Sequence, residues 1–223
     1  MILTVGNTKG GTGKTTLAVQ LALALARTGR DVLLIDGDRQ GTAQIAVAQR
    51  AEAGAQPPLA CVQYTDGRVL REQVRLQAPR YQDVVIDAGG RDSATLRAAL
   101  VVSDVLLVPF LPRSVDVWAL ADIAELIEEA RTVRSGLTTL AVLNCADPGA
   151  SPDNSEALAA LADLPQLTGV NTAITRRKAF ANATGRGLSI DELTPVDPKA
   201  IGEMVALLRN VLSFADTMTI NGG

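Results

Sequence analysis

A glycine-rich segment near the start of the chain constrains the fold more than any other feature of the sequence. It reads Gly6-Asn-Thr-Lys-Gly-Gly-Thr-Gly-Lys-Thr-Thr16 and lies between a short apolar run, Ile2–Val5, and an amphipathic stretch, Lys14–Thr28. Glycines in such a turn let consecutive backbone N–H groups approach a polyphosphate that side chains would block. The helix that follows would direct its positive end at the same anion. A strand, a loop and a helix in this order predict a phosphate-binding loop.

Two side chains of this loop suit particular tasks. Lys14 would reach the β- and γ-phosphates, and the Thr15 hydroxyl would ligate Mg²⁺. Thr8 stands where the usual Gly-x-x-x-x-Gly-Lys-Thr pattern has its first glycine. Only four of the 21 basic residues are lysines, and two of these four, Lys9 and Lys14, bracket the loop. Because a compact ammonium fits well among phosphates, this usage favours a phosphate cradle over an ordinary glycine turn.

Beyond the loop, short β-branched or leucine-rich runs alternate with longer stretches rich in Ala, Leu, Glu and Arg. This alternation predicts one α/β domain over residues 1–223, with a mostly parallel, twisted sheet and helices on both faces. The expected strands are Ile2–Val5, Asp31–Asp36, Leu59–Gln63, Asp83–Asp87, Val105–Pro109, Thr138–Asn144 and Asn171–Ile174. The expected helices are Lys14–Thr28, Thr42–Ala53, Gly67–Leu76, Ser93–Val102, Val115–Arg134, Pro152–Ala162, Arg177–Thr184 and Asp197–Phe214.

Composition excludes several kinds of chemistry. The chain contains no histidine, which rules out a Ser-His-Asp triad and a histidine metal site. Cys61 and Cys145 do not have the spacing of a metal-binding pair and suggest no disulfide framework, so a reduced, cytoplasmic chain is expected. The net charge of −3 argues against a protein that coats nucleic acid. Neither a leader peptide nor a membrane-spanning segment is expected.

Three aspartates follow expected strands. Asp36 and Asp38 come at the end of the second strand, and Asp87 ends the fourth. Because the carboxyl ends of parallel strands meet at one edge of a sheet, these side chains should lie beside the phosphate loop. A carboxylate there can hold Mg²⁺ through water or orient an attacking water molecule. The alternative for any one of them is a strand end that caps the next helix.

Three segments carry a family resemblance. Lys9-Gly-Gly-Thr-Gly-Lys-Thr-Thr16 resembles the deviant Walker A box of the ParA/MinD ATPases, whose diagnostic residue is the extra lysine, here Lys9. Val32-Leu-Leu-Ile-Asp-Gly-Asp-Arg-Gln-Gly41 is similar to the family's second box, with Arg39 in place of its usual proline. Val84-Val-Ile-Asp-Ala-Gly-Gly90 resembles its Walker B strand and second switch. In length the chain is most similar to small plasmid-type ParA proteins.

The resemblance implies a P-loop ATPase that binds ATP and Mg²⁺ and hydrolyses ATP. Asp87 would contact the metal through water, Asp36 would support the metal shell in the same way, and Asp38 would position the attacking water. Catalysis would thus rest on Lys9, Lys14 and Asp38. Lys9 would reach the nucleotide of a second copy, so that ATP joins a homodimer and hydrolysis releases it. The alternative is that Lys9 only neutralises the phosphates of its own subunit.

A candidate site for the base follows the sixth expected strand. Asn144-Cys-Ala-Asp147 matches half of the guanine-specifying Asn-Lys-x-Asp box but lacks its lysine. In the ParA family an asparagine here faces adenine, whose N6 and N7 atoms suit an amide. ATP is therefore favoured over GTP, chiefly because of the box around Lys9. The expected nucleotide-binding residues are Gly10, Gly11, Thr12, Gly13, Lys14, Thr15, Thr16 and Asn144.

A basic cluster lies in the last quarter of the chain, at Arg176, Arg177 and Lys178. ParA proteins bind DNA without sequence preference through basic residues of their C-terminal part, and Arg209 is a further candidate. Phosphate contacts from a dimer would make such binding depend on ATP and on salt. The alternative is a solvated basic helix start, because acidic residues follow closely in sequence.

The resemblance as a whole implies an ATPase that dimerises with ATP, binds nucleoid DNA without sequence preference and positions a cargo, with a ParB-like or other adaptor stimulating hydrolysis. Plasmid DNA is the favoured cargo, and carboxysomes or chemoreceptor clusters are alternatives. A MinD-like membrane regulator would need a basic amphipathic C-terminal helix, whereas residues 213–223 contain no Lys or Arg. No membrane partner is therefore expected. A synthetase or kinase on the same fold would need a substrate pocket, for which no insertion is evident.

Overall fold

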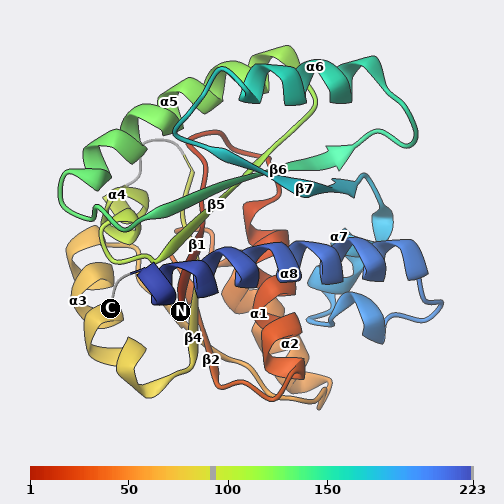
Figure 1. Cartoon of the computed structure of the whole chain (residues 1–223). Helices are drawn as coiled ribbons and strands as arrows, with labels where there is room; N and C mark the ends of the chain where they lie inside the picture. The colour runs from red at the N-terminus through yellow and green to blue at the C-terminus, as the bar shows by residue number, and fades with distance from the viewer. Residues whose placement is uncertain (91–93, 222–223) are drawn as a thin grey trace.

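Seven strands form one sheet in the order β3-β2-β4-β1-β5-β6-β7 (Figure 1). The computed structural model describes residues 1–90 and 94–221, without the side chains of 114–119 and 216–221. All described strand pairs are parallel, so the predicted α/β class is confirmed. The strands are β1 (Ile2–Val5), β2 (Val32–Asp36), β3 (Ala60–Gln63), β4 (Asp83–Asp87), β5 (Val105–Phe110), β6 (Thr138–Ala146) and β7 (Thr168–Thr175).

Helices cover both faces of the sheet, as Figure 1 shows. One face packs against α1 (Lys14–Arg27), α2 (Thr42–Glu52), α7 (Lys178–Gly185) and α8 (Pro198–Asn221). The other packs against α3 (Gly67–Gln77), α4 (Ala94–Leu100), α5 (Ser114–Arg131) and α6 (Pro152–Leu161). Short 3₁₀ turns occur at Ala78–Arg80 and Ile190–Glu192.

Side-chain alternation along the strands explains the two layers. In β5, Leu107 packs in the layer of α1 and α8, whereas its neighbour Leu106 packs against α4 and α5. Both are fully buried. Complete burial of such a side chain contributes about 1.5–3 kcal/mol, so the near-continuous apolar runs of the central strands hold the two helix layers to the sheet.

The sheet places β1 at its centre, with three strands on each side. The segment that follows β1 therefore emerges in the middle of the carboxyl edge. The register aligns Val5 of β1 with Asp87 of β4, and Asp87 with Asp36 of β2. The segments that follow β1, β2 and β4 thus begin at the same level of the sheet.

The largest differences from the expected elements lie near the C-terminus. β7 spans Thr168–Thr175, longer than the expected Asn171–Ile174, because Gly169 and the polar residues around it hide the strand pattern. Its pairing with β6 also shifts register twice. α8 continues past Phe214 to Asn221. The expected start of the fourth helix, Ser93, lies outside the described residues.

Among the described residues, the structure contains no helix with the length and apolar character needed to cross a bilayer.

Candidate nucleotide site

The loop between β1 and α1 has the backbone shape of a phosphate cradle. Gly11 and Gly13 adopt the left-handed conformation, with φ of 77° and 87°, which side chains rarely tolerate. A Cβ added at Gly10 or Gly11 would meet no atom within 4 Å, so the space above these residues is open. At Gly13 a Cβ would lie 2.2 Å from the Asn144 side-chain nitrogen. The loop is thus open on the side of the first two glycines and closely backed by β6.

The Lys14 side chain lies inside this cradle. It is 8% exposed, and its Nζ donates a hydrogen bond of 2.8 Å to the Lys9 carbonyl oxygen. Burial lowers the pKa of Lys14, while the nearby carboxylates of Asp87 and Asp38 act in the opposite direction. A Cβ on Gly90 would lie 3.1 Å from Nζ. The structure therefore brings the loop lysine, two of the three predicted aspartates and the segment after β4 into one site.

Asp87 is the buried acid of the site, with 1% exposure. The Thr15 hydroxyl donates a hydrogen bond to it. Its Oδ2 atom has no hydrogen-bond partner among the residues that the structure describes. Burial raises the pKa of Asp87 to about 7, and the Asp36 charge adds to this effect. A buried carboxylate oxygen without a partner beside a threonine hydroxyl fits the oxygen donors that Mg²⁺ prefers, directly or through water.

Asp36 has a different environment, although it is equally buried. Its Oδ1 accepts a hydrogen bond from the Asp38 backbone N–H, and its Oδ2 accepts one from the Gln44 N–H, both at 3.0 Å. Burial raises the pKa of Asp36, and these backbone donors oppose the rise. Asp36 therefore positions the backbone of residues 38–44. Its support of the metal shell stays a prediction.

Asp38 lies at the surface end of the same turn and is half-buried. Its Oδ1 accepts a hydrogen bond of 3.0 Å from the Gln40 N–H, and its carbonyl oxygen accepts one of 2.8 Å from the Gln63 side chain. Gln63 is the last residue of β3, so the turn is held from the neighbouring strand. This arrangement fixes the turn that carries Asp38 beside the cradle.

Asn144 contacts the phosphate loop directly. Its Nδ2 donates a hydrogen bond of 2.7 Å to the Thr12 carbonyl oxygen, and its side chain is buried. The next residue, Cys145, has a φ of 50°, and the pairing of β6 with β7 shifts register around it. In this structure the amide thus supports the loop backbone. Its contact with adenine stays a prediction.

Sequence reasoning missed two residues that shape the site. Asn7 is buried; it donates to the Pro109 carbonyl oxygen at 2.8 Å and accepts from the Lys9 N–H at 3.1 Å. Gly37 donates its backbone N–H to the Asp87 carbonyl oxygen at 2.8 Å, and a Cβ there would lie only 2.9 Å from that atom. The sequence did contain a signal for each residue. Asn7 is a polar residue between an apolar strand and a run of glycines, and Gly37 is a glycine between two aspartates.

The predicted basic cluster does not form a uniform patch. Arg176 and Lys178 are exposed, as is Arg209 on α8. Arg177 instead donates hydrogen bonds to Glu203 of α8 at 3.0 and 3.3 Å, and its guanidinium lies 3.6 Å from Asp197. The Glu203 hydrogen bond raises the pKa of Arg177. Arg177 therefore ties the start of α7 to α8, while its two neighbours face solvent.

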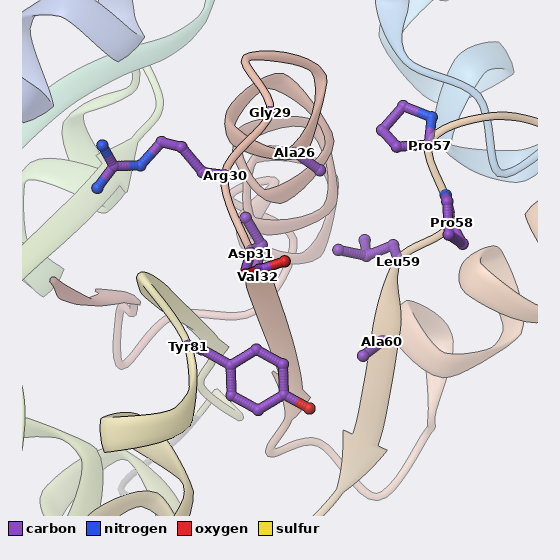
Figure 2. A pocket seen from close by; sticks show the side chains of 10 residues that line it. All are labelled: Ala26, Gly29, Arg30, Asp31, Val32, Pro57, Pro58, Leu59, Ala60 and Tyr81. Atoms are coloured by element: carbon purple, nitrogen blue, oxygen red, sulfur yellow. The ribbon is translucent and has the colours of Figure 1, made fainter.

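A separate pocket of about 500 Å³ lies near the amino ends of β2 and β3 (Figure 2). Its walls include Val32, Leu59 and Tyr81. The Arg30 side chain beside it pairs with the buried Asp83. Because strand amino ends lie opposite the carboxyl edge, this pocket is at the far end of the sheet from the glycine loop. It contributes nothing to the phosphate cradle.

The comparison with known proteins places these features in a family. A family model described as CobQ/CobB/MinD/ParA nucleotide binding domain matches residues 3–190. The chain belongs to this family. The resemblance stated from the sequence is thereby confirmed.

One relative and two solved structures illustrate the family. The relative is the maintenance of carboxysome distribution protein A of Halothiobacillus neapolitanus, 32% identical over 94% of this chain and 95% of its own length. The complex of Cyanothece McdA with ATP has a TM-score of 0.77 at 16% identity, covering 94% of this chain and 95% of that one. The septum site-determining protein MinD of Pyrococcus horikoshii, complexed with Mg-ADP, has a TM-score of 0.74 at 19% identity and covers 97% and 98%. At these identities the structures show the shared fold, and their ATP and Mg-ADP agree with the predicted cofactors of the family.

Replacing Asp87 with Asn should change how stability depends on pH in the nucleotide-free protein. Between about pH 4 and pH 7 the folded state keeps a proton on Asp87 that the unfolded chain releases. The free energy of unfolding therefore falls as pH rises through this window. We expect the variant to lose less stability than the parent protein between pH 5 and pH 8, and to melt a few °C higher at pH 8, because each kcal/mol shifts Tm by roughly 2–4 °C.

Thermal melts in EDTA without nucleotide measure this difference. The matched control is Asp122→Asn, an exposed aspartate of α5. Parallel pH profiles for the Asp87 variant and the parent protein would show that the buried carboxylate does not take up the proton.

Proposed function

We propose that this chain is an ATPase that positions a cargo through a cycle of ATP-dependent dimerisation. The observation that carries the proposal is the meeting of Lys14, Asp87 and Asp38 in one glycine-lined cradle. Lys14 would hold the terminal phosphates, and Asp38 would orient the attacking water. Thr15 and, through water, Asp87 would hold Mg²⁺, which neutralises phosphate charge when bound.

Lys9 would make the dimer depend on nucleotide. Its backbone is fixed in the loop, because its N–H donates to Asn7 and its carbonyl oxygen accepts from Lys14. Lys9 is half-buried and directly precedes Gly10 and Gly11, above which the space is open. A second copy facing this loop would bring its own phosphates within reach of the ammonium. Hydrolysis followed by release of the γ-phosphate would then remove part of the negative charge that holds the two copies together.

A carboxysome is the cargo best supported by the comparisons. The Halothiobacillus relative, named for the maintenance of carboxysome distribution, covers nearly all of this chain. Plasmid DNA, the cargo favoured from the sequence, has less support among these relatives. We therefore propose a carboxysome as the cargo and an adaptor protein as the partner that stimulates hydrolysis.

Exposed basic residues would form the surface that binds DNA. Arg176 and Lys178 follow the carboxyl end of β7, and Arg209 lies on α8. We propose that these residues contact DNA phosphates without reading bases. Arg177 is left out of this set, since Glu203 and Asp197 already balance its charge.

Two substitutions should separate nucleotide binding from hydrolysis. Lys14→Ala removes the ammonium of the cradle, so we expect the affinity for ATP to fall at least 100-fold, about 2.7 kcal/mol. Asp38→Ala should keep ATP binding and dimerisation but lower turnover by at least 100-fold. Fluorescent-nucleotide titration, size-exclusion chromatography with ATP or ADP, and phosphate release measure the three properties. Lys199→Ala, an exposed lysine on α8, is the control.

Normal hydrolysis by the Asp38 variant would remove the water-positioning role from this residue. Loss of dimerisation in Asp38→Ala with ATP binding intact would contradict the proposed order of events.

Charge reversal should test the DNA surface. The double variant Arg176→Glu and Lys178→Glu should weaken binding to random-sequence duplex DNA at least tenfold. It should also reduce the slope of log affinity against log salt by about 0.9 for each lost phosphate contact. Fluorescence anisotropy across a salt series, with ATP and the Asp38→Ala background, measures both. The control is Arg80→Glu, at the end of the Ala78–Arg80 turn. Equal affinity for DNA in the parent protein and both variants would exclude this surface as the DNA-binding site.

The cargo is tested in the source cell. Deletion of the gene should leave carboxysomes clustered, visible as fluorescent foci, while plasmid retention stays unchanged. Plasmid loss with evenly spaced carboxysomes would instead support partition. A source cell without carboxysomes would exclude the proposed cargo outright.

A further inference from the structure

We infer that Gln63, the last residue of β3, is a positioning residue for hydrolysis, because its side chain holds the turn that carries Asp38. This turn comprises residues 38–41 and leads from β2 into α2. The role rests on the proposed function, since it concerns the step at which Asp38 orients the attacking water. It adds a residue outside the phosphate loop and its acids on which the rate of turnover depends.

Most hydrogen bonds that shape the turn come from residues close by in sequence. The Asp38 N–H donates to Asp36 Oδ1, and the Gln40 N–H donates to Asp38 Oδ1, both at 3.0 Å. The Gly41 N–H donates to the Asp38 carbonyl oxygen at 3.2 Å, which closes a β-turn. Arg39 and Gln40 form the centre of this turn and are exposed. Packing against the core therefore does little to hold the turn in place.

The Gln63 side chain supplies a hydrogen bond from outside the turn. Its Nε2 donates to the Asp38 carbonyl oxygen at 2.8 Å, across 25 residues of sequence. Among the described residues, no other hydrogen bond joins residues 38–40 to a segment outside residues 36–44. Gln63 is thus the connection between this part of the turn and a neighbouring strand.

Backbone pairing fixes the position of Gln63 itself. In the parallel register of β2 and β3, Gln63 lies opposite Asp36. The next residue, Tyr64, donates its N–H to the Asp36 carbonyl oxygen at 2.9 Å. A Cβ on Gly41 would lie 3.2 Å from Gln63 Nε2, so the glycine leaves room for the amide. The end of β3 therefore presents a fixed hydrogen-bond donor to the turn.

The turn in its place orients the Asp38 carboxylate. Oδ1 accepts the Gln40 N–H, whereas Oδ2 has no hydrogen-bond partner in the part of the chain that the structure describes. Oδ2 is therefore the oxygen that can accept a hydrogen bond from water. Because a small misplacement of an orienting group slows a reaction steeply, a loosened turn should slow hydrolysis. It should not weaken ATP binding, for which Lys14 and the glycine loop are proposed.

The variant Gln63→Met tests this role, because methionine keeps the length of the side chain and removes the donor. We expect turnover to fall about five- to tenfold, as for the loss of one hydrogen bond, while ATP affinity and dimerisation with ATP stay unchanged. In the nucleotide-free protein the Gln40 and Gly41 amides should exchange hydrogen faster. Phosphate release, fluorescent-nucleotide titration, size-exclusion chromatography and hydrogen-exchange mass spectrometry measure these properties. The control is Gln82→Met, whose native Oε1 accepts the Asp31 N–H at 2.9 Å at the amino end of the sheet.

A stiffer turn should replace the lost amide. Arg39 occupies the second position of the β-turn, where the fixed φ of proline is favoured. Its N–H makes no hydrogen bond to any described residue, so proline removes no donor used there. Adding Arg39→Pro to Gln63→Met should therefore restore at least about half of the lost turnover and slow the exchange of the Gly41 amide. Adding Arg39→Ala, which removes the same charge, should restore neither.

Four results would overturn the inference and leave the proposed ATPase intact. Two are parent-like turnover in Gln63→Met and an equal loss in Gln82→Met. The third is a fall in ATP affinity that matches the fall in turnover, because Gln63 would then shape the phosphate cradle. The fourth is recovery with Arg39→Ala, because charge, and not stiffness, would then be responsible. A parent protein that binds ATP without hydrolysing it would instead contradict the proposed function, and hydrogen exchange would still show whether Gln63 holds the turn.

Discussion

The register of three central strands determines the nucleotide site. Val5, Asp87 and Asp36 lie opposite one another across β1, β4 and β2. This row brings the start of the phosphate loop and two acids to one level at the carboxyl edge. A shift of one residue would turn each side chain to the other face of the sheet, so the apolar alternation that builds the two layers also fixes the chemistry.

Two buried carboxylates on neighbouring strands create an electrostatic conflict, and the structure resolves it unequally. Asp36 uses both oxygens to accept backbone N–H groups. Asp87 receives the Thr15 hydroxyl and keeps one oxygen without a described partner, and its pKa rises accordingly. A proton or a nearby cation removes that penalty, because a charged buried carboxylate is costly unless it is paired. The difference in hydrogen-bond partners therefore explains why Asp36 organises a turn while Asp87 suits a metal.

Local pattern was sufficient to predict the strand-loop-helix unit, the α/β class and the convergence of Lys14, Asp38 and Asp87. These features depend on glycine conformation and on strand ends, which neighbouring residues determine. Contacts between distant segments were beyond such reasoning. Arg177 pairs with Glu203, 26 residues away, and Asn144 bonds to Thr12 on a different strand connection. The strand β7 was underestimated for a related reason, since its pairing with β6, and not its own apolar pattern, makes it a strand.

Two relatives of this chain are named for carboxysome distribution and for chromosome partitioning, although both match it over more than half of its length. A phosphate cradle needs glycines, a lysine and strand-end acids, and these positions leave little freedom. The edge strand β7 is under no such constraint, because three positions in the strand order separate it from β1, which carries the phosphate loop. Differences between relatives are therefore expected at the sheet edge, where the fold tolerates change, while the centre of the sheet keeps the phosphate cradle.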